Sequence, residues 1–119
     1  DMTIHQVTIQ PDGSFDPHRL SKLLPGDTVV FTMAPDRSMV PGVVLCVYPS
    51  SIFGATRYEI PFGTMVDLTV QPAASGQSFV MQAHVATLDR RCSRDFEGSV
   101  GDEPSGGEVG GDDEPDGGG

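Results

Sequence analysis

The chain has 119 residues, which is enough for one small domain. Its formal net charge of −10 repels a polyanion, so nucleic acid is not an expected partner. It has no run of about 18 apolar residues, so we expect no insertion into a membrane.

The acidic side chains are concentrated at the C-terminal end. Residues 1–94 carry eight acidic and seven basic side chains, whereas residues 95–119 carry nine acidic side chains and no basic one. The last segment is also rich in glycine and poor in apolar side chains, so it cannot bury enough surface to offset the entropy of ordering. We therefore expect residues 95–119 to form a disordered acidic tail.

The first part of the chain contains three segments with strand character. Residues 1–17 are expected to form an N-terminal extension, in which residues 3–9 look extended but alternate imperfectly. After a Pro-Gly turn, residues 27–33 alternate as a half-buried strand does. Residues 40–48 are apolar on both sides, which indicates a strand buried on both faces.

The clearest pattern lies in residues 50–71. It begins with a short apolar strand segment, crosses a turn at residues 61–63, and ends in a strand that directs Val66, Leu68 and Val70 to one face. The other face of that strand carries Met65, Asp67, Thr69 and Gln71. One face of this strand is therefore expected to belong to the core.

A last strand is expected in residues 78–88. Five or six short strands joined by Gly/Pro turns predict an all-β fold. We expect residues 18–94 to form a small antiparallel β-barrel of about six strands, since closure removes exposed sheet edges.

The inventory for catalysis is poor, and we do not expect an enzyme. His5, His18 and His84 stand in no metal-binding spacing, and no nucleophile motif or phosphate-binding loop is present. Cys46 and Cys92 also lack a metal or redox spacing, so we expect buried free thiols in a reducing compartment. Free thiols in a reducing compartment place the chain in the cytoplasm. We also expect no metal and no other cofactor.

The order of these segments resembles that of the PilZ domain, a small bacterial β-barrel that typically receives cyclic di-GMP. The resemblance covers about residues 18–90. It depends on an Ile-Phe-x-x-Thr strand, a proline, a Gly-Thr-x-Val turn, a Pro/Gly loop and a last strand that ends in a small residue, x and Val. The matching residues are Ile52, Phe53, Thr56, Pro61, Gly63, Thr64, Val66, Pro72, Gly76, Ala83 and Val85.

The ligand positions of the PilZ pattern are largely replaced in this sequence. His18 and Lys22 take the two basic positions before the first strand, with Arg19 between them. The later positions, for an Asp/Asn, a Ser and a Gly, are occupied by Cys46, Tyr48 and Ser51. A lost hydrogen bond at a buried polar contact costs about 1–3 kcal/mol, so the resemblance implies weak or no binding of cyclic di-GMP.

The resemblance implies a non-catalytic adaptor that acts through protein–protein contacts, in bacterial motility, pilus or polarity control. The expected partner-contact residues are those on the ligand side of such a domain: His18, Arg19, Lys22, Tyr48 and Arg57. A functional cyclic di-GMP receptor is the first alternative.

A second alternative comes from a resemblance to cupredoxins. Residues 3–31, with a Phe-x-Pro segment followed by GDTVVF, resemble the opening of that family. In FVMQAH, Met81 then takes the place of the copper-binding cysteine, and His84 that of a histidine ligand. A blue-copper centre needs a thiolate and two imidazoles, so this resemblance implies a β-sandwich with a degenerate copper site. A β-barrel interaction module related to neither family is the third interpretation.

Overall fold

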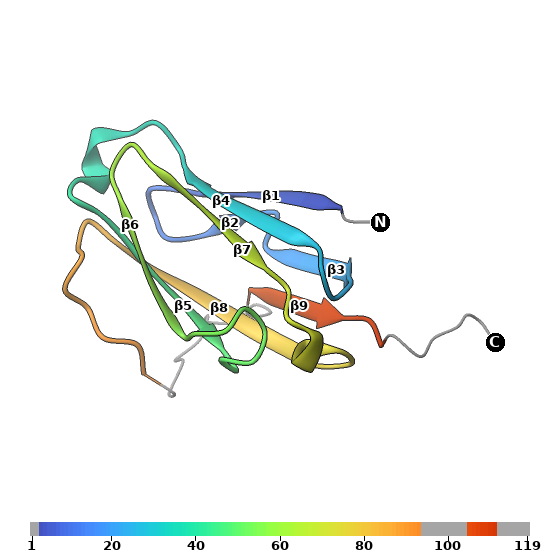
Figure 1. Ribbon diagram of the computed structural model, residues 1–119. Helices are drawn as coiled ribbons and strands as arrows, with labels where there is room; N and C mark the ends of the chain where they lie inside the picture. Colours follow the sequence, from blue (N-terminus) through green and yellow to red (C-terminus); the bar gives the residue numbers. More distant parts are fainter. Residues whose placement is uncertain (1–2, 94–104, 112–119) are drawn as a thin grey trace.

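The computed structural model describes residues 3–93 and 105–111, which form nine strands and two short 3-10 helices (Figure 1). The strands are β1 (Ile4–Ile9), β2 (Phe15–Asp16), β3 (Arg19–Leu23), β4 (Thr28–Met33), β5 (Gly42–Tyr48), β6 (Arg57–Pro61), β7 (Met65–Thr69), β8 (Ser78–Val85) and β9 (Gly106–Val109). The 3-10 helices are η1 (Arg37–Met39) and η2 (Pro72–Ala74). Neither helix in these two ranges has the length or apolar character to cross a membrane.

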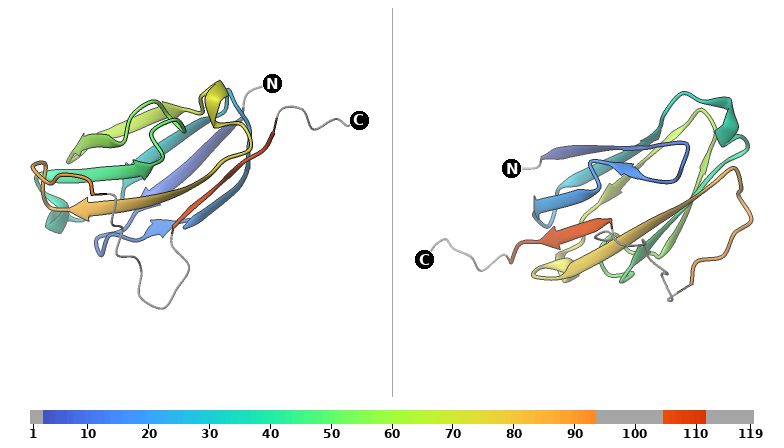
Figure 2. Two further views of the ribbon diagram at one scale, coloured as in Figure 1. Left: turned by 90° about the horizontal axis from the view of Figure 1, so that it is seen from below. Right: turned by 180° about the vertical axis from the view of Figure 1, so that it is seen from behind.

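The strands form two sheets that lie in two layers (Figures 1 and 2). Sheet A has the strand order β2-β1-β4-β7, and sheet B has the order β3-β9-β8-β5-β6. Both sheets are mixed, because β1 pairs in parallel with β4 and β3 in parallel with β9, while the other neighbours are antiparallel. The all-β class is confirmed, but the expected closed barrel is wrong, since the described strands leave two edges on each sheet.

One hydrophobic core fills the space between the sheets. Four of its rings meet edge to face in a row, with successive centroids 6.3, 6.3 and 6.2 Å apart: Phe15, Phe31, Phe53 and Phe79. Such contacts add about 0.5–1.5 kcal/mol each beyond the burial of the rings. The inward face predicted for residues 65–71 is confirmed, because Leu68 and Val70 are buried and Val66 packs against the core.

The N-terminal segment is an integral part of sheet A. β1 lies between β2 and β4, in parallel register from Ile4 opposite Thr28 to Ile9 opposite Met33. Its Val7 side chain is fully buried in the core. The segment expected to form an N-terminal extension therefore supplies an interior strand of sheet A.

Residues 95–119 were expected to be disordered, but they include one ordered strand, β9. It inserts between β3 and β8, where Gly107 lies opposite Leu20 on one side and Phe79 on the other. A Cβ atom on Gly107 would overlap the backbone carbonyl of Leu20, so the close approach of the strands requires glycine. A Gly-rich segment is thus ordered by backbone pairing with its neighbours. Residues 95–104 and 112–119 lie outside the described ranges.

The two cysteines also differ from expectation. Cys46 and Cys92 form a disulfide, so the predicted free thiols are wrong. No spacing rule indicates this pair, because 46 residues separate the two positions in sequence. The bond attaches residues 86–92, which we name the strap, to the outer face of sheet B.

The strap is also held by Arg57 on β6. The Arg57 Nε donates to the carbonyl of Arg90 (2.9 Å), and Nη2 donates to the carbonyl of Leu88 (2.8 Å). Beneath this cover, the outward side chains of Val44 and Cys46 on β5 are fully buried. The burial predicted on both faces of residues 40–48 is confirmed for residues 42–47, whereas Val40 and Pro41 are exposed, and the strap lies on the side that faces away from the core.

Candidate functional site

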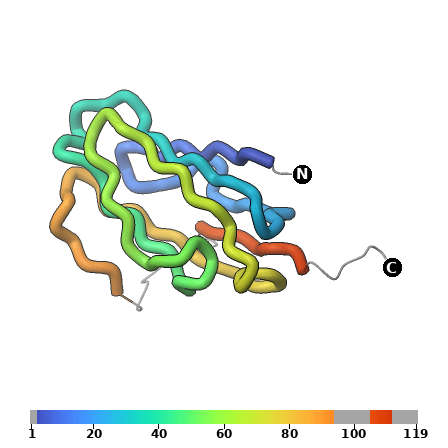
Figure 3. The backbone as a smooth tube through the Cα atoms, viewed as in Figure 1, coloured from blue at the N-terminus to red at the C-terminus, as the bar shows by residue number. Residues whose placement is uncertain are grey.

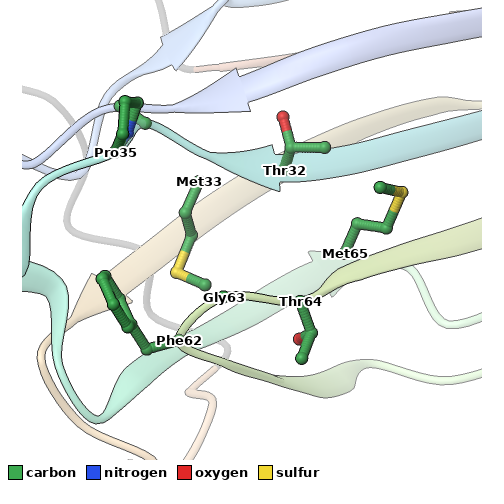
Figure 4. Close-up of a pocket in the computed structure, with 8 residues that line it drawn as sticks. Thr32, Met33, Pro35, Phe62, Gly63, Thr64 and Met65 are labelled. Carbon is green, nitrogen blue, oxygen red and sulfur yellow. The ribbon is translucent and has the colours of Figure 1, made fainter.

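Figure 3 shows the β4–β5 connection and the β6–β7 turn at the same end of the sandwich. A pocket opens between the end of β4 and this turn (Figure 4). The connection and the turn touch, since the Phe62 N–H donates to the carbonyl of Pro41 (2.8 Å). The pocket, which we name the end pocket, has a volume of about 330 Å³, near the lower limit of roughly 300 Å³ for small-ligand sites. Its lining residues are Thr32, Met33, Ala34, Pro35, Phe62, Gly63, Thr64 and Met65.

The surface around the end pocket is apolar and exposed. Met65 is 61 % exposed, Val40 48 % and Phe62 38 %, although side chains of these types are usually buried. No lining residue carries a charge. Figure 4 shows the Met33 side chain extending toward the turn that carries Phe62 and Gly63. Because methionine side chains are flexible and polarizable, the end pocket can adapt to apolar groups of different shapes.

Two of the five predicted contact residues, Arg19 and Tyr48, share the outer face of sheet B. The register places them in one row across the sheet, with Gly106 and Val80 between them. Three strand steps of about 4.8 Å separate them, which amounts to roughly 14 Å. They lie on one surface but do not form a compact site.

The other three predicted residues are dispersed. Arg57 lies on β6, four strand steps or roughly 19 Å from β3 at the opposite edge of sheet B. Its guanidinium binds the strap and, through Nη1, the carboxylate of Glu59 (2.7 Å). His18 is exposed just before β3, and Lys22 has a positive φ of 67° at the register shift in β3. The five residues thus span the width of sheet B.

The residues that the cupredoxin resemblance selects do not converge. Met81 faces the core and is 4 % exposed, whereas His84, three positions along β8, faces the outside of sheet B. Burial, and then the nearby Arg90 charge, lower the pKa of His84 below its usual value. Cys46 and Cys92 supply no thiolate, because they are joined. Within residues 3–93 and 105–111, no three His, Cys, Asp or Glu side chains are grouped to hold a metal ion.

Asp27 is the only buried charged residue in the described ranges, at 2 % exposure. His5 Nε2 lies 3.0 Å from its Oδ2, and the backbone N–H groups of Leu24 and Thr3 donate to the same carboxylate at 3.1 and 3.2 Å. Burial raises the pKa of Asp27, but these hydrogen bonds outweigh that effect, so the pKa lies below its usual value. Asp27 therefore ties the start of β1 to the turn before β4.

We expect Asp27→Asn to lower the free energy of unfolding at neutral pH by about 1–2 kcal/mol, because it weakens charge-assisted hydrogen bonds. The pKa of Asp27 is lowered relative to about 3.9 in the unfolded chain, so this stabilisation is present above about pH 4 and is lost as the pH falls through the folded-state pKa. Urea unfolding at neutral pH and at about pH 3 measures both effects. Asp67→Asn, at an exposed position, is the control. If the two variants respond equally to acid, this account of Asp27 is wrong.

Sequence reasoning selected no residue of the end pocket. One signal was present, since Met65 occupies the face of its strand that otherwise carries polar side chains, and Phe62 stands in a turn. Exposed apolar side chains that gather at one place indicate a contact surface. Their proximity to Val40 and Pro35 depends on contacts between distant segments, and those are visible only in the fold.

Comparisons of this chain with models of protein families, with curated proteins and with solved structures find no match.

Proposed function

We propose that this chain is a non-catalytic recognition domain that binds a partner protein through the end pocket. The exposed apolar side chains of Phe62 and Met65, which both line the end pocket, carry the proposal, because exposed apolar surface around a pocket marks interaction sites. Its burial by a partner gains about 25 cal/mol for each Å² of apolar surface removed from water. The adaptor role expected from the sequence is kept, but its contact site moves from the outer face of sheet B to the end of the sandwich.

The two-layer arrangement supports a cupredoxin-like β-sandwich better than a PilZ-like barrel as a description of the fold. A copper-dependent role draws no support, because Met81 and His84 face opposite sides of β8. Roles in motility, pilus or polarity control, and any binding of cyclic di-GMP, remain predictions from the PilZ resemblance alone.

The disulfide changes the proposed location. The cytoplasm was expected because Cys46 and Cys92 were predicted to be free thiols, and they are joined instead. Disulfides persist in oxidising compartments and are rare where thioredoxin and glutathione keep thiols reduced. We therefore propose that the domain works outside the cytoplasm.

The proposed function predicts that peptides selected from a random display library for binding to this chain occupy the end pocket. Replacement of Phe62 by Ser is expected to weaken their binding about tenfold or more, because aromatic anchors carry much of the energy of an interface. Calorimetric titration measures the change. Ile4→Ser is the matched control, since Ile4 is 65 % exposed at the other end of sheet A. A library that yields no binder, or binders indifferent to Phe62→Ser, would sink the proposal.

A further inference from the structure

The edge of sheet A beside the end pocket differs from the other sheet edges of the described chain. β2 has only two residues. β3 has an irregular register between Leu20 and Leu23. β6 ends in Pro61, which has no N–H to donate. Short strands, bulges and prolines are the devices by which proteins protect sheet edges from pairing. β7 has none of these: it is a regular five-residue strand, antiparallel to β4 alone.

The outward backbone groups of β7 can be identified from the hydrogen bonds at its end. The Val70 N–H donates to the carbonyl of Asp27 (2.8 Å), and the Val70 carbonyl accepts from Gly26 (2.9 Å), so Val70 faces the β4 side. Backbone groups of successive residues in a strand point in opposite directions. The N–H and C=O groups of Met65 and Asp67 therefore point away from β4, toward the open edge.

The side chains near this edge determine which kind of partner segment can bind there. Met65 is the first residue of β7 and is 61 % exposed, so a strand added at this edge meets an apolar side chain at that end of β7. Two residues further along β7, Asp67 is exposed on the outer face of the sheet. Its carboxylate is the only charged side chain of β7. An added strand therefore meets an apolar side chain, Met65, and, roughly 7 Å along, a negative charge.

We propose that the edge of β7 binds an extended segment of a partner protein, which adds a strand to sheet A. The segment places an apolar side chain against the exposed Met65 and a Lys or Arg beside Asp67. Backbone hydrogen bonds supply affinity and the alternate side chains supply specificity, as in other cases of strand addition. The carboxylate of Asp67, with no basic side chain on β7 to neutralise it, favours such a basic partner. This inference rests on the proposed function and names the conformation and chemistry of the occupant.

The test uses peptides selected from a random nonapeptide display library against the whole chain. Amide hydrogen exchange is measured with and without each peptide. We expect the Met65 and Asp67 amides to exchange at least about tenfold more slowly in the complex, because each gains a backbone acceptor. We also expect a basic residue in the selected peptides, and binding about tenfold weaker to Asp67→Lys. Asp16→Lys is the matched control, because Asp16 is exposed on β2 at the other edge of sheet A. Urea unfolding verifies that both variants fold.

The outcomes separate the two proposals. Slower exchange at both amides, with weaker binding to Asp67→Lys but not to Asp16→Lys, supports strand addition at β7. Peptides that depend on Phe62 but leave the Met65 and Asp67 amides unprotected overturn strand addition and leave the recognition role of the end pocket in place. Peptides indifferent to both Phe62→Ser and Asp67→Lys overturn both.

Discussion

Cys92→Ala is expected to lower the free energy of unfolding by about 4 kcal/mol, since the disulfide closes a loop with a sequence separation of 46 and loop-closure entropy gives that value. For a domain whose total stability is about 5–15 kcal/mol, this is a large fraction. The strap then depends on the hydrogen bonds from Arg57 to the carbonyls of Leu88 and Arg90. Urea unfolding followed by circular dichroism measures the loss.

A reductant provides the internal control for this prediction. Reduced wild-type protein should unfold at nearly the same urea concentration as Cys92→Ala, and the variant itself should not respond to the reductant. Asp89→Ala changes an exposed strap residue without touching the disulfide and should stay within about 0.5 kcal/mol of the wild type. A variant as stable as the oxidised wild type would mean that the disulfide does not stabilise the fold.

The second large effect is expected from Gly107→Ala, at about 3 kcal/mol of destabilisation. The added Cβ meets the backbone carbonyl of Leu20, and backbone atoms cannot move aside as a flexible side chain does. β9 must then shift or leave its position between β3 and β8. Amide exchange should therefore quicken along β9 and along the adjoining part of β8, and the melting temperature should fall.

Glu108→Ala tests whether the effect is specific to the close approach. Glu108 is exposed on the same strand, so its replacement should change stability by less than about 0.5 kcal/mol. If Gly107→Ala and Glu108→Ala behave alike, β9 is not packed as tightly as its spacing to Leu20 implies.

Two central strands, β5 and β7, were predictable because their side chains report their own environment, whereas the strand expected at Ile52 and Phe53 is wrong, since those residues lie in a turn and β6 begins at Arg57. Residues 65–69 alternate, and their inward residue Leu68 is buried. Residues 42–48 are apolar on both sides and are buried on both sides. In each case the signal is local, because successive side chains of a strand point to opposite faces and their polarity reports what each face contacts.

Sheet closure, β9 and the disulfide were not predictable, because each depends on partners far away in sequence. The alternation of a strand is the same in a barrel and in a sandwich, so it gives no information on which strands pair. β3 and β9 pair although Arg19 and Gly106 are distant along the chain. β9 has the composition of a disordered tail, and it is ordered by backbone contacts with Leu20 and Phe79 that composition does not report.

The candidate site was not predictable either, because it also depends on segments that are distant in sequence. The five predicted contact residues came from family spacing, and the fold spreads them across sheet B from Arg19 to Arg57. The end pocket combines the end of β4 with the turn after β6. Met65 gives a local indication of the end pocket, because it is an exposed apolar residue on a strand face that otherwise carries polar side chains.

Both described ends of the chain lie at the end of the sandwich opposite the pocket (Figure 1). Thr3 is held there by its N–H bond to Asp27, and Gly110 donates to the carbonyl of Leu23, which precedes the same turn. A tether at either terminus therefore anchors the domain by its far end and directs the pocket away from the point of attachment. Fusion to another domain, or immobilisation through a terminal tag, leaves the β7 edge and the end pocket accessible from the surrounding solution.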